Sequence, residues 1–185
     1  MSSQPFYTRK GDDGTTGLLG EGRVLKTDPR MEALGALDEA SAALGMARSL
    51  AQAQGLQEIL LQVQRELYQL MAEVAATPEN AQRFRMIGEN HIHWLEEQTD
   101  RLSGQVSMPR EFIVPGDNPA GAAFSLARAV VRRAERRVVQ CWQAEQLSNP
   151  HLLGYLNRLS SLCFVLELFE VQSTGKQKPT LAKGG

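Results

Sequence analysis

The sequence has few of the residues from which disulfide frameworks and metal centres are built. Its two cysteines, Cys141 and Cys163, stand in apolar surroundings without CxxC spacing. This excludes a disulfide-stabilised fold and predicts buried thiols in a reducing compartment. Of the three histidines, His91 and His93 diverge on a helix and His151 stands alone. No histidine metal site is therefore predicted, and the metal ligands stay unknown.

The chain also lacks an excess of charge and an apparent membrane segment. Its formal net charge is -1, so no overall field recruits nucleic acid or an anionic membrane. We see no apolar run that approaches membrane-spanning length, and the first residues, MSSQPF, contain no apolar signal-peptide core. We therefore expect a soluble cytoplasmic protein with neither nucleic acid nor membrane as partner.

What the chain does contain is helical periodicity from residue 29 to about 171. A capping side chain followed by proline marks three helix starts, at Asp28-Pro29, Asn118-Pro119 and Asn149-Pro150. Two further helices are predicted over about 56–76 and, from a weaker pattern, over about 80–104. We predict one all-α domain over residues 1–185: an irregular arm to about residue 28, a five-helix bundle over about 29–171, and a flexible tail over about 172–185.

Residues 7–18, YTRKGDDGTTGL, differ from the rest of the chain. Three glycines and few apolar residues exclude a helix or a buried strand. Donors suited to phosphate oxygens are concentrated in Thr8, Arg9, Lys10, Thr15 and Thr16, with Lys26 just beyond. Asp12 or Asp13 would assist a hydrated Mg²⁺. The segment matches no P-loop, and the same composition also favours a disordered or hairpin terminus.

The helix that starts at Pro119 carries two sets of charges. Arg128, Arg132 and Glu135 lie on a stripe that borders the core. This stripe forms either an intrahelical ladder of salt bridges or a pair of guanidinium groups that bind phosphate, or a carboxylate across a subunit boundary. Three further arginines, Arg133, Arg136 and Arg137, fall roughly opposite the core and are most simply solvated.

The first helix supplies a candidate carboxylate for that boundary. Asp38 belongs to a stripe of small residues, Gly35, Ala42 and Gly45, that would let a neighbouring helix approach closely. On the last helix, Asn157 points to the flank of the core face and alone indicates little.

An apolar island in the loop before Pro119 has two interpretations. Residues 112–116, FIVPG, either tuck under the bundle to anchor the loop or form an aromatic wall for a flat ligand.

Together these segments resemble the PduO-type ATP:cob(I)alamin adenosyltransferases. The matching blocks are YTRKGDDGTTGL at 7–18, Lys26, RMEALGALDE at 30–39, FIVPG at 112–116, RAVVRRAER at 128–136 and YLNRLS at 155–160. They keep the order of that family and span nearly the whole chain, from residue 7 to about 166.

The resemblance implies a five-helix homotrimer that binds ATP and a corrinoid between adjacent subunits. It implies transfer of the 5′-deoxyadenosyl group of ATP to Co(I), with release of triphosphate. By the same resemblance, Asp38 pairs with Arg128 across the interface, and Phe112 lies against the lower face of the corrin and keeps an axial ligand off cobalt. Mg²⁺ would accompany ATP, and a reductase and a B12-dependent enzyme would be further partners. The implied ATP contacts are Thr8, Arg9, Gly11, Asp12, Gly14, Thr15, Thr16, Lys26, Arg132, Glu135 and Asn157.

The chain departs from the family pattern at a few positions. Ser125 stands where the family usually has histidine, Ser161 where it usually has aspartate, and Leu168 where it often has arginine. DEAS at 38–41 replaces DELN. These changes bear on corrinoid handling more than on ATP binding. Two other functions stay open: a carrier or sensor of ATP or corrinoid without turnover, and a helical interaction protein with a disordered arm.

Overall fold

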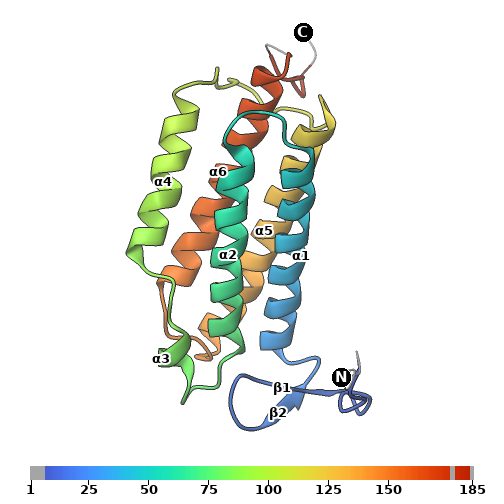
Figure 1. Cartoon of the computed structure of the whole chain (residues 1–185), viewed down its shortest axis with the longest axis vertical. Helices are drawn as coiled ribbons and strands as arrows, with labels where there is room; N and C mark the ends of the chain where they lie inside the picture. The colour runs from blue at the N-terminus through green and yellow to red at the C-terminus, as the bar shows by residue number, and fades with distance from the viewer. Residues whose placement is uncertain (1–6, 176–177, 184–185) are drawn as a thin grey trace, which may run out of the picture.

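Five long helices form the bundle in a computed structural model that describes residues 7–175 and 178–183. Figure 1 shows them roughly parallel or antiparallel to one another, with a small hairpin beneath. The predicted all-α five-helix fold is confirmed. The elements are β1 (Thr15–Gly17), β2 (Arg23–Leu25), α1 (Pro29–Leu50), α2 (Leu56–Ala75), α3 (Ala81–Phe84), α4 (Glu89–Ser103), α5 (Pro119–Gln143) and α6 (His151–Ser173).

The predicted caps are present at two of the three helix starts. Asp28 accepts from the Arg30 N–H at 2.9 Å, and Asn118 accepts from the Gly121 N–H at 2.6 Å. Proline occupies the first turn in both helices. At the third start, the helix begins one residue later than predicted, because Pro150 is the N-cap residue and Asn149 accepts from the His151 N–H instead.

The pattern over 80–104 does not form one helix. It divides into the single turn α3 and the helix α4, separated by residues 85–88. Ile87 in this gap is buried, and its carbonyl oxygen accepts from the Asn149 side chain at 2.9 Å. The segment therefore crosses the end of the bundle in an extended path, and Gly88 starts α4 afresh.

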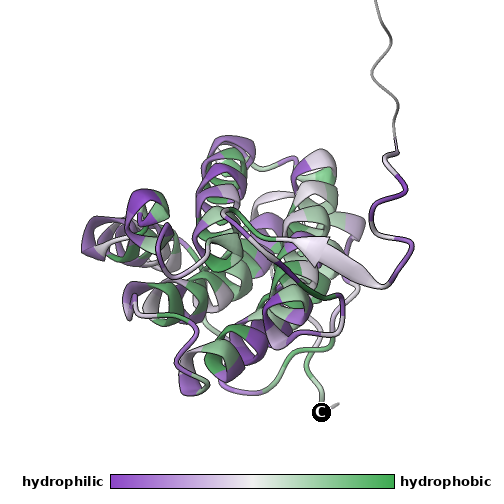
Figure 2. Cartoon of the chain, turned by 90° about the horizontal axis from the view of Figure 1, so that it is seen from below, coloured by the Kyte–Doolittle hydropathy of each residue, from purple (hydrophilic) through white to green (hydrophobic). Residues whose placement is uncertain are grey.

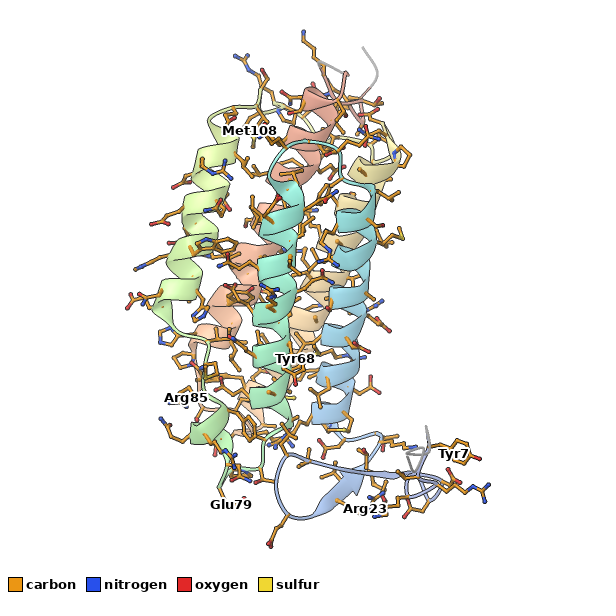
Figure 3. All side chains as sticks on the ribbon, viewed as in Figure 1. Tyr7, Arg23, Tyr68, Glu79, Arg85 and Met108 are labelled. Atoms are coloured by element: carbon orange, nitrogen blue, oxygen red, sulfur yellow. The ribbon has the colours of Figure 1, made fainter. Side chains whose placement is uncertain are left out.

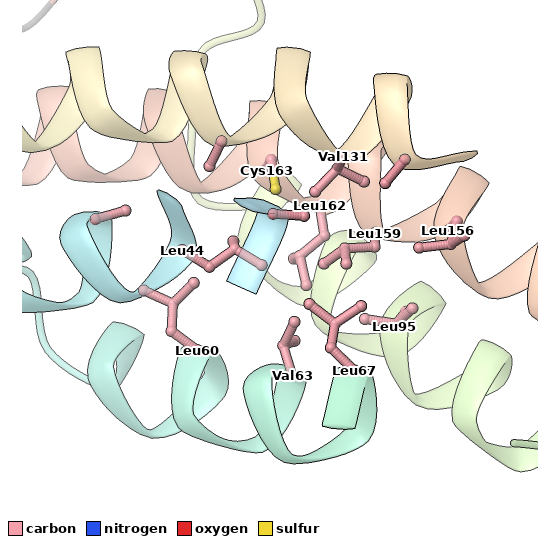
Figure 4. Close-up of a cluster of buried hydrophobic side chains, with 14 of the residues drawn as sticks. Leu44, Leu60, Val63, Leu67, Leu95, Val131, Leu156, Leu159, Leu162 and Cys163 are labelled. Atoms are coloured by element: carbon pink, nitrogen blue, oxygen red, sulfur yellow. The ribbon is translucent and has the colours of Figure 1, made fainter. Parts of the chain in front are cut away.

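Leucine-rich faces from all five long helices meet in one core. Figure 4 shows Leu60, Val63 and Leu67 of α2 directed toward Leu159 and Leu162 of α6. α5 packs against α1 and α6, whereas α4 packs mainly against α6. Viewed from below, the helices are greener toward the bundle interior and more purple outside (Figure 2). The apolar periodicity of the sequence is thus satisfied within one chain.

Helix α6 corrects the expectation that no apolar run approaches membrane-spanning length. By length and composition it qualifies as a membrane span among the described helices. However, 61% of its most apolar stretch is buried inside the bundle. Burial among the other helices of the bundle therefore explains the apolar composition of α6.

The arm is a hairpin attached to the end of α2. Strands β1 and β2 pair antiparallel, with Thr16 opposite Val24. Leu19, in the turn between them, donates to the Ala75 carbonyl oxygen at 2.8 Å and accepts from the Thr77 N–H at 3.2 Å. Over residues 7–28, the structure therefore contains a hairpin. Its strand residues are exposed or half-buried, which agrees with the prediction that the segment forms no buried strand.

Residues 178–183 of the C-terminal tail pair with the loop before α5. The flexible tail predicted over about 172–185 stays a prediction, and residues 176–177 and 184–185 lie outside the described residues. Val114 donates its N–H to the Thr180 carbonyl oxygen at 2.8 Å, and Ala182 donates to the Phe112 carbonyl oxygen at 2.7 Å. Asp117 accepts from both the N–H and the hydroxyl of Thr180, at 2.8 and 2.7 Å. Residues 180–182 thus form a strand-like edge along residues 112–114.

Candidate functional site

The arm is held together by its own cations. Lys26 donates its ammonium to the Gly11 carbonyl oxygen at 2.7 Å, and its backbone N–H to the Gly14 carbonyl oxygen at 2.9 Å. A side chain at position 11 would come within 3.1 Å of the Lys26 Nζ, and Gly14 has a φ of 79°. Both glycines therefore have a steric reason to be glycine.

Arg23, which the sequence did not single out, is the second cation of the arm. It donates to the carbonyl oxygens of Lys10 and Thr15 at 2.5 and 3.1 Å, and to the Thr15 hydroxyl at 2.8 Å. Asp13 accepts from the N–H and hydroxyl of Thr15, and these bonds, with the charge of Arg23 as a smaller contribution, lower the pKa of Asp13. The sequence feature that could have identified Arg23 is a cation on the segment that pairs with the threonine-rich strand.

The remaining arm candidates are exposed or half-buried and lie close together. Arg9 has a φ of 60° and lies over the Tyr7 ring, 5.4 Å from its centre. The Thr8 hydroxyl accepts from the Lys10 N–H at 3.4 Å, Thr16 is a strand residue, and the Asp12 side chain is exposed. The arm therefore presents two further polar side chains and a cation to solvent around a fixed turn.

A second polar group lies midway along the bundle, where α4, α5 and α6 adjoin. Asn157 donates to the Glu135 carboxylate at 3.1 Å and accepts from Arg158 at 2.7 Å, and Arg158 also contacts Glu96 at 2.7 Å. Arg132 is exposed on the same helix as Glu135. Because Glu135 bonds to Asn157 on α6, the intrahelical ladder is not what the structure forms.

Two of the three arginines expected to be solvated form ion pairs with α1 and stay partly exposed, and the third, Arg136, is exposed. Arg133 forms an ion pair with Glu39, and Arg137 lies 3.7 Å from Glu32. These exposed ion pairs join α1 to α5 at the surface and contribute little to the stability of the fold. Arg132 and Arg128 are left available to other partners.

Asp38 is exposed on α1, as are Gly35 and Ala42 of the small-residue stripe, whereas Gly45 is half-buried beside Gln64 of α2. A methyl group placed on the Gly35 Cα would meet nothing within 4 Å. In the described chain, no hydrogen bond or ion pair joins Asp38 to Arg128. Around Gly35 and Asp38, the stripe therefore makes no close helix packing in the described chain.

A cleft of about 430 Å³ opens between the loop before α5 and the helices α5 and α6. Phe112 on the loop is 88% exposed. Across the cleft, the Arg128 guanidinium lies over the Phe164 ring, 5.6 Å from its centre. The lining residues are Pro109, Arg110, Glu111, Phe112, Ile113, Pro115, Ser125, Arg128, Phe164 and Glu167. The aromatic-wall interpretation therefore fits Phe112, while the tail, not burial under the bundle, anchors the loop.

The cleft also contains Glu167, which reasoning from the sequence missed. It is only 4% exposed. Burial raises the pKa of Glu167 to about 7, against the opposing effects of a hydrogen bond from Ser125 and the charge of Arg128. The sequence feature that could have identified Glu167 is a lone carboxylate between Leu166 and Leu168 on an apolar helix.

Within one chain, the candidate residues form three separate groups: the arm, the polar group around Asn157, and the cleft beside Phe112. In Figure 3, Tyr7 and Arg23 mark the arm at one end of the bundle, and Met108 marks the loop end at the other. Helix α5, with 25 residues, spans roughly 37 Å between them. Among the described residues, no hydrogen bond or ion pair links the arm to Arg132, Glu135 or Asn157.

The positions that depart from the family pattern lie in different environments. Ser125 lines the cleft, Leu168 is fully buried, and Ser161 is exposed beside the Asn157 carbonyl oxygen. Of the three, only Ser125 lines the cleft.

Comparison with known proteins gives one consistent result. The family model described as cobalamin adenosyltransferase matches residues 6–170. A corrinoid adenosyltransferase PduO of Citrobacter freundii is 40% identical over 87% of this chain, and this chain spans about half of it, 48%. A shorter corrinoid adenosyltransferase of the same organism is 36% identical, over 89% of this chain and 94% of its own length.

Solved structures agree with the sequence comparison. A variant PduO-type ATP:corrinoid adenosyltransferase from Lactobacillus reuteri, complexed with cobalamin and ATP, superposes with a TM-score of 0.88. It is 30% identical and covers 97% of this chain and all, 100%, of its own. Since the family model covers most of the chain and the relatives agree over nearly the same residues, this chain belongs to the cobalamin adenosyltransferase family.

Proposed function

We propose that this protein transfers the 5′-deoxyadenosyl group of ATP to the Co(I) centre of a corrinoid. The electron pair of Co(I) attacks C5′, a Co–C bond forms, the C5′–O bond breaks, and triphosphate leaves. The observation that carries the proposal is the exposed Phe112 at a cleft that also holds Arg128. A large aromatic side chain so exposed on an anchored loop suits a flat apolar ligand such as a corrin ring.

The arm and the midway polar group would bind ATP. In this proposal Thr8, Arg9, Gly11, Asp12, Gly14, Thr15, Thr16 and Lys26 contact the triphosphate, with Arg132, Glu135 and Asn157 completing the nucleotide site. Cations that surround the phosphates stabilise the charge that develops on the leaving group. The turn at Gly11 and Gly14 supports this role, because it brings the Lys26 ammonium to the Gly11 carbonyl oxygen and so keeps that cation within the arm.

Mg²⁺ would arrive with ATP and would not occupy a protein cage. Among the described residues, no group of three or more His, Cys, Asp or Glu side chains is placed to hold a metal. Mg²⁺ in nucleotide sites commonly uses one or two carboxylates, waters and the substrate phosphates. Asp12, exposed beside the turn, fits as that single carboxylate.

The complete site would lie between subunits of a homotrimer. The arm hairpin and the loop before α5 stand at opposite ends of the bundle (Figure 1). Asp38 and its neighbours Gly35 and Ala42 are exposed on α1. A neighbouring copy that packs on this stripe would bring Asp38 to Arg128. We further propose that the protein works in the cytoplasm, receives its corrinoid reduced by a reductase, and passes its product to a B12-dependent enzyme.

An anaerobic assay with cob(I)alamin and MgATP tests the proposal. We expect the Co(I) absorption to decay with formation of adenosylcobalamin and one triphosphate per turnover, and no decay when ADP replaces ATP. Binding of both ligands without conversion would instead support the carrier or sensor. Hydrogen exchange provides the remaining test, because a helical interaction protein would show no MgATP protection of residues 7–20.

A further inference from the structure

Four buried glutamates lie in this bundle, and three of them have structural partners. Glu66 accepts from the Tyr155 hydroxyl at 2.8 Å, and Glu73 accepts from Asn149 at 3.0 Å. Glu170 accepts from the backbone N–H groups of residues 52 and 53, which close the end of α1. These three carboxylates hold one segment to another, and none of them lines the cleft beside Phe112.

Glu167 differs because it lines a cleft. In the described chain, the Ser125 hydroxyl is near enough to its carboxylate to lower the pKa of Glu167. A carboxylate has about four acceptor sites, so most of its capacity is left for another group. The guanidinium of Arg128 lies over Phe164 and makes no ion pair with Glu167 within 4 Å among the described residues. A buried carboxylate with most of its acceptor positions unbonded destabilises the folded protein unless a further donor binds it.

The ligand proposed for this cleft has such donors. A fully amidated corrin ring carries acetamide and propionamide groups around its edge, each with two N–H donors. The cleft is too small to enclose a whole ring, so it would receive one edge beside Phe112. Ser125 and Glu167, on facing helices, are the polar pair at its wall, with Arg128, Arg110, Glu111 and Asp117 as the other charged groups around it.

We propose that Glu167, held by Ser125, is a specificity-determining residue that accepts a peripheral carboxamide of the corrin and rejects a carboxylate at the same position. This rests on the proposed function, because it assigns one contact within the corrinoid site. An amide N–H donates to the carboxylate, whereas an unamidated corrin would place two negative charges together. The substrate class is therefore the fully amidated corrinoids.

The test compares cobalamin with its monocarboxylic acids, in which one peripheral carboxamide is hydrolysed. We measure kcat/KM with the Co(I) forms, and equilibrium binding with the Co(II) forms, at pH 8. The wild-type protein should disfavour at least one monocarboxylic isomer by about tenfold, the cost of one moderate like-charge contact. Glu167→Gln should reduce that preference to about twofold, and Ser125→Ala should weaken it.

Glu66→Gln is the matched control, because it removes the charge of a buried glutamate outside the cleft. It should lower thermal stability and leave the wild-type preference unchanged. If Glu167→Gln keeps the wild-type preference for every isomer in both kinetics and binding, the assignment is wrong. Failure of wild-type turnover would refute the proposed function instead, while the binding preference would still decide the role of Glu167.

Discussion

The arm and the cleft stand at opposite ends of the bundle and are built in opposite ways. The arm is a single short segment whose cations, Lys26 and Arg23, bond to backbone carbonyl oxygens of that same segment. The cleft is assembled from a loop and two helices, and its central features are an exposed Phe112 and a buried Glu167. A polyphosphate site can be encoded locally, whereas a site for a large flat ligand needs walls from distant parts of the chain.

Loss of Arg132, the cation that we propose binds phosphate, should give the largest effect. Arg132→Ala should reduce kcat by roughly 10²–10³, because a donor aimed at the leaving triphosphate acts most strongly in the transition state. The initial rate of adenosylcobalamin formation measures this change. Arg65→Ala, which removes an exposed arginine from α2, should leave the rate near that of the wild type. Equal rates for both variants would contradict the placement of Arg132.

Removal of the aromatic wall should affect the other substrate. Phe112→Ala should lower kcat/KM for the corrinoid by roughly tenfold or more, because it removes a large apolar contact surface. Its KM for ATP should stay within about twofold of the wild type. Steady-state kinetics with each substrate varied separately test this separation. A matching rise in the KM for ATP would show that the two regions are not independent.

Stability of the cleft should depend on pH through Glu167. The raised pKa, about 7, means that the folded protein keeps a proton which the unfolded chain releases near pH 4.5. Stability from this group is therefore present below about pH 4.5 and is lost as pH rises through 7. Glu167→Gln removes this loss, so it should gain about 1–2 kcal/mol relative to the wild type between pH 5 and pH 8, with water in the cleft limiting the value.

Denaturant unfolding of both proteins at pH 5 and pH 8 measures that difference. The arm supplies the contrast, because the pKa of Asp13 is lowered and its carboxylate is exposed. Asp13→Asn should show no comparable gain at pH 8. A constant offset between wild type and Glu167→Gln at the two pH values would refute the titration of Glu167.

The smallest effect should come from the tail. Thr180→Val removes the hydroxyl that donates to Asp117 at 2.7 Å and should loosen the loop by about 0.5–1.5 kcal/mol. Faster hydrogen exchange at the Val114 and Ala182 amides would show this loosening, with a rise of a few fold in KM for the corrinoid. Exchange in the arm should not change. Unaltered exchange at both amides would mean that the tail does not hold the loop.

Local signals predicted much of this molecule. The capping side chains of Asp28 and Asn118 and the leucine spacing located most helices, because these features act within a turn or two. The composition of residues 7–18 located the arm. In contrast, the pairing of Thr180 with Asp117 joins positions 63 apart along the chain, and a short tail without periodicity gives no sign of it. Glu167 was missed because a lone carboxylate does not reveal which neighbour it will face.

The ordered hairpin has a thermodynamic consequence for nucleotide binding. In the proposed ATP complex, the Lys26 ammonium would leave the Gly11 carbonyl oxygen for a phosphate oxygen, so binding would exchange partners within an existing fold. Little chain ordering would accompany the event, and the calorimetric heat-capacity change for ATP should be small. The enthalpy of ATP binding should likewise reflect the difference between the charge-assisted bonds broken to carbonyl oxygens and those formed to phosphate oxygens.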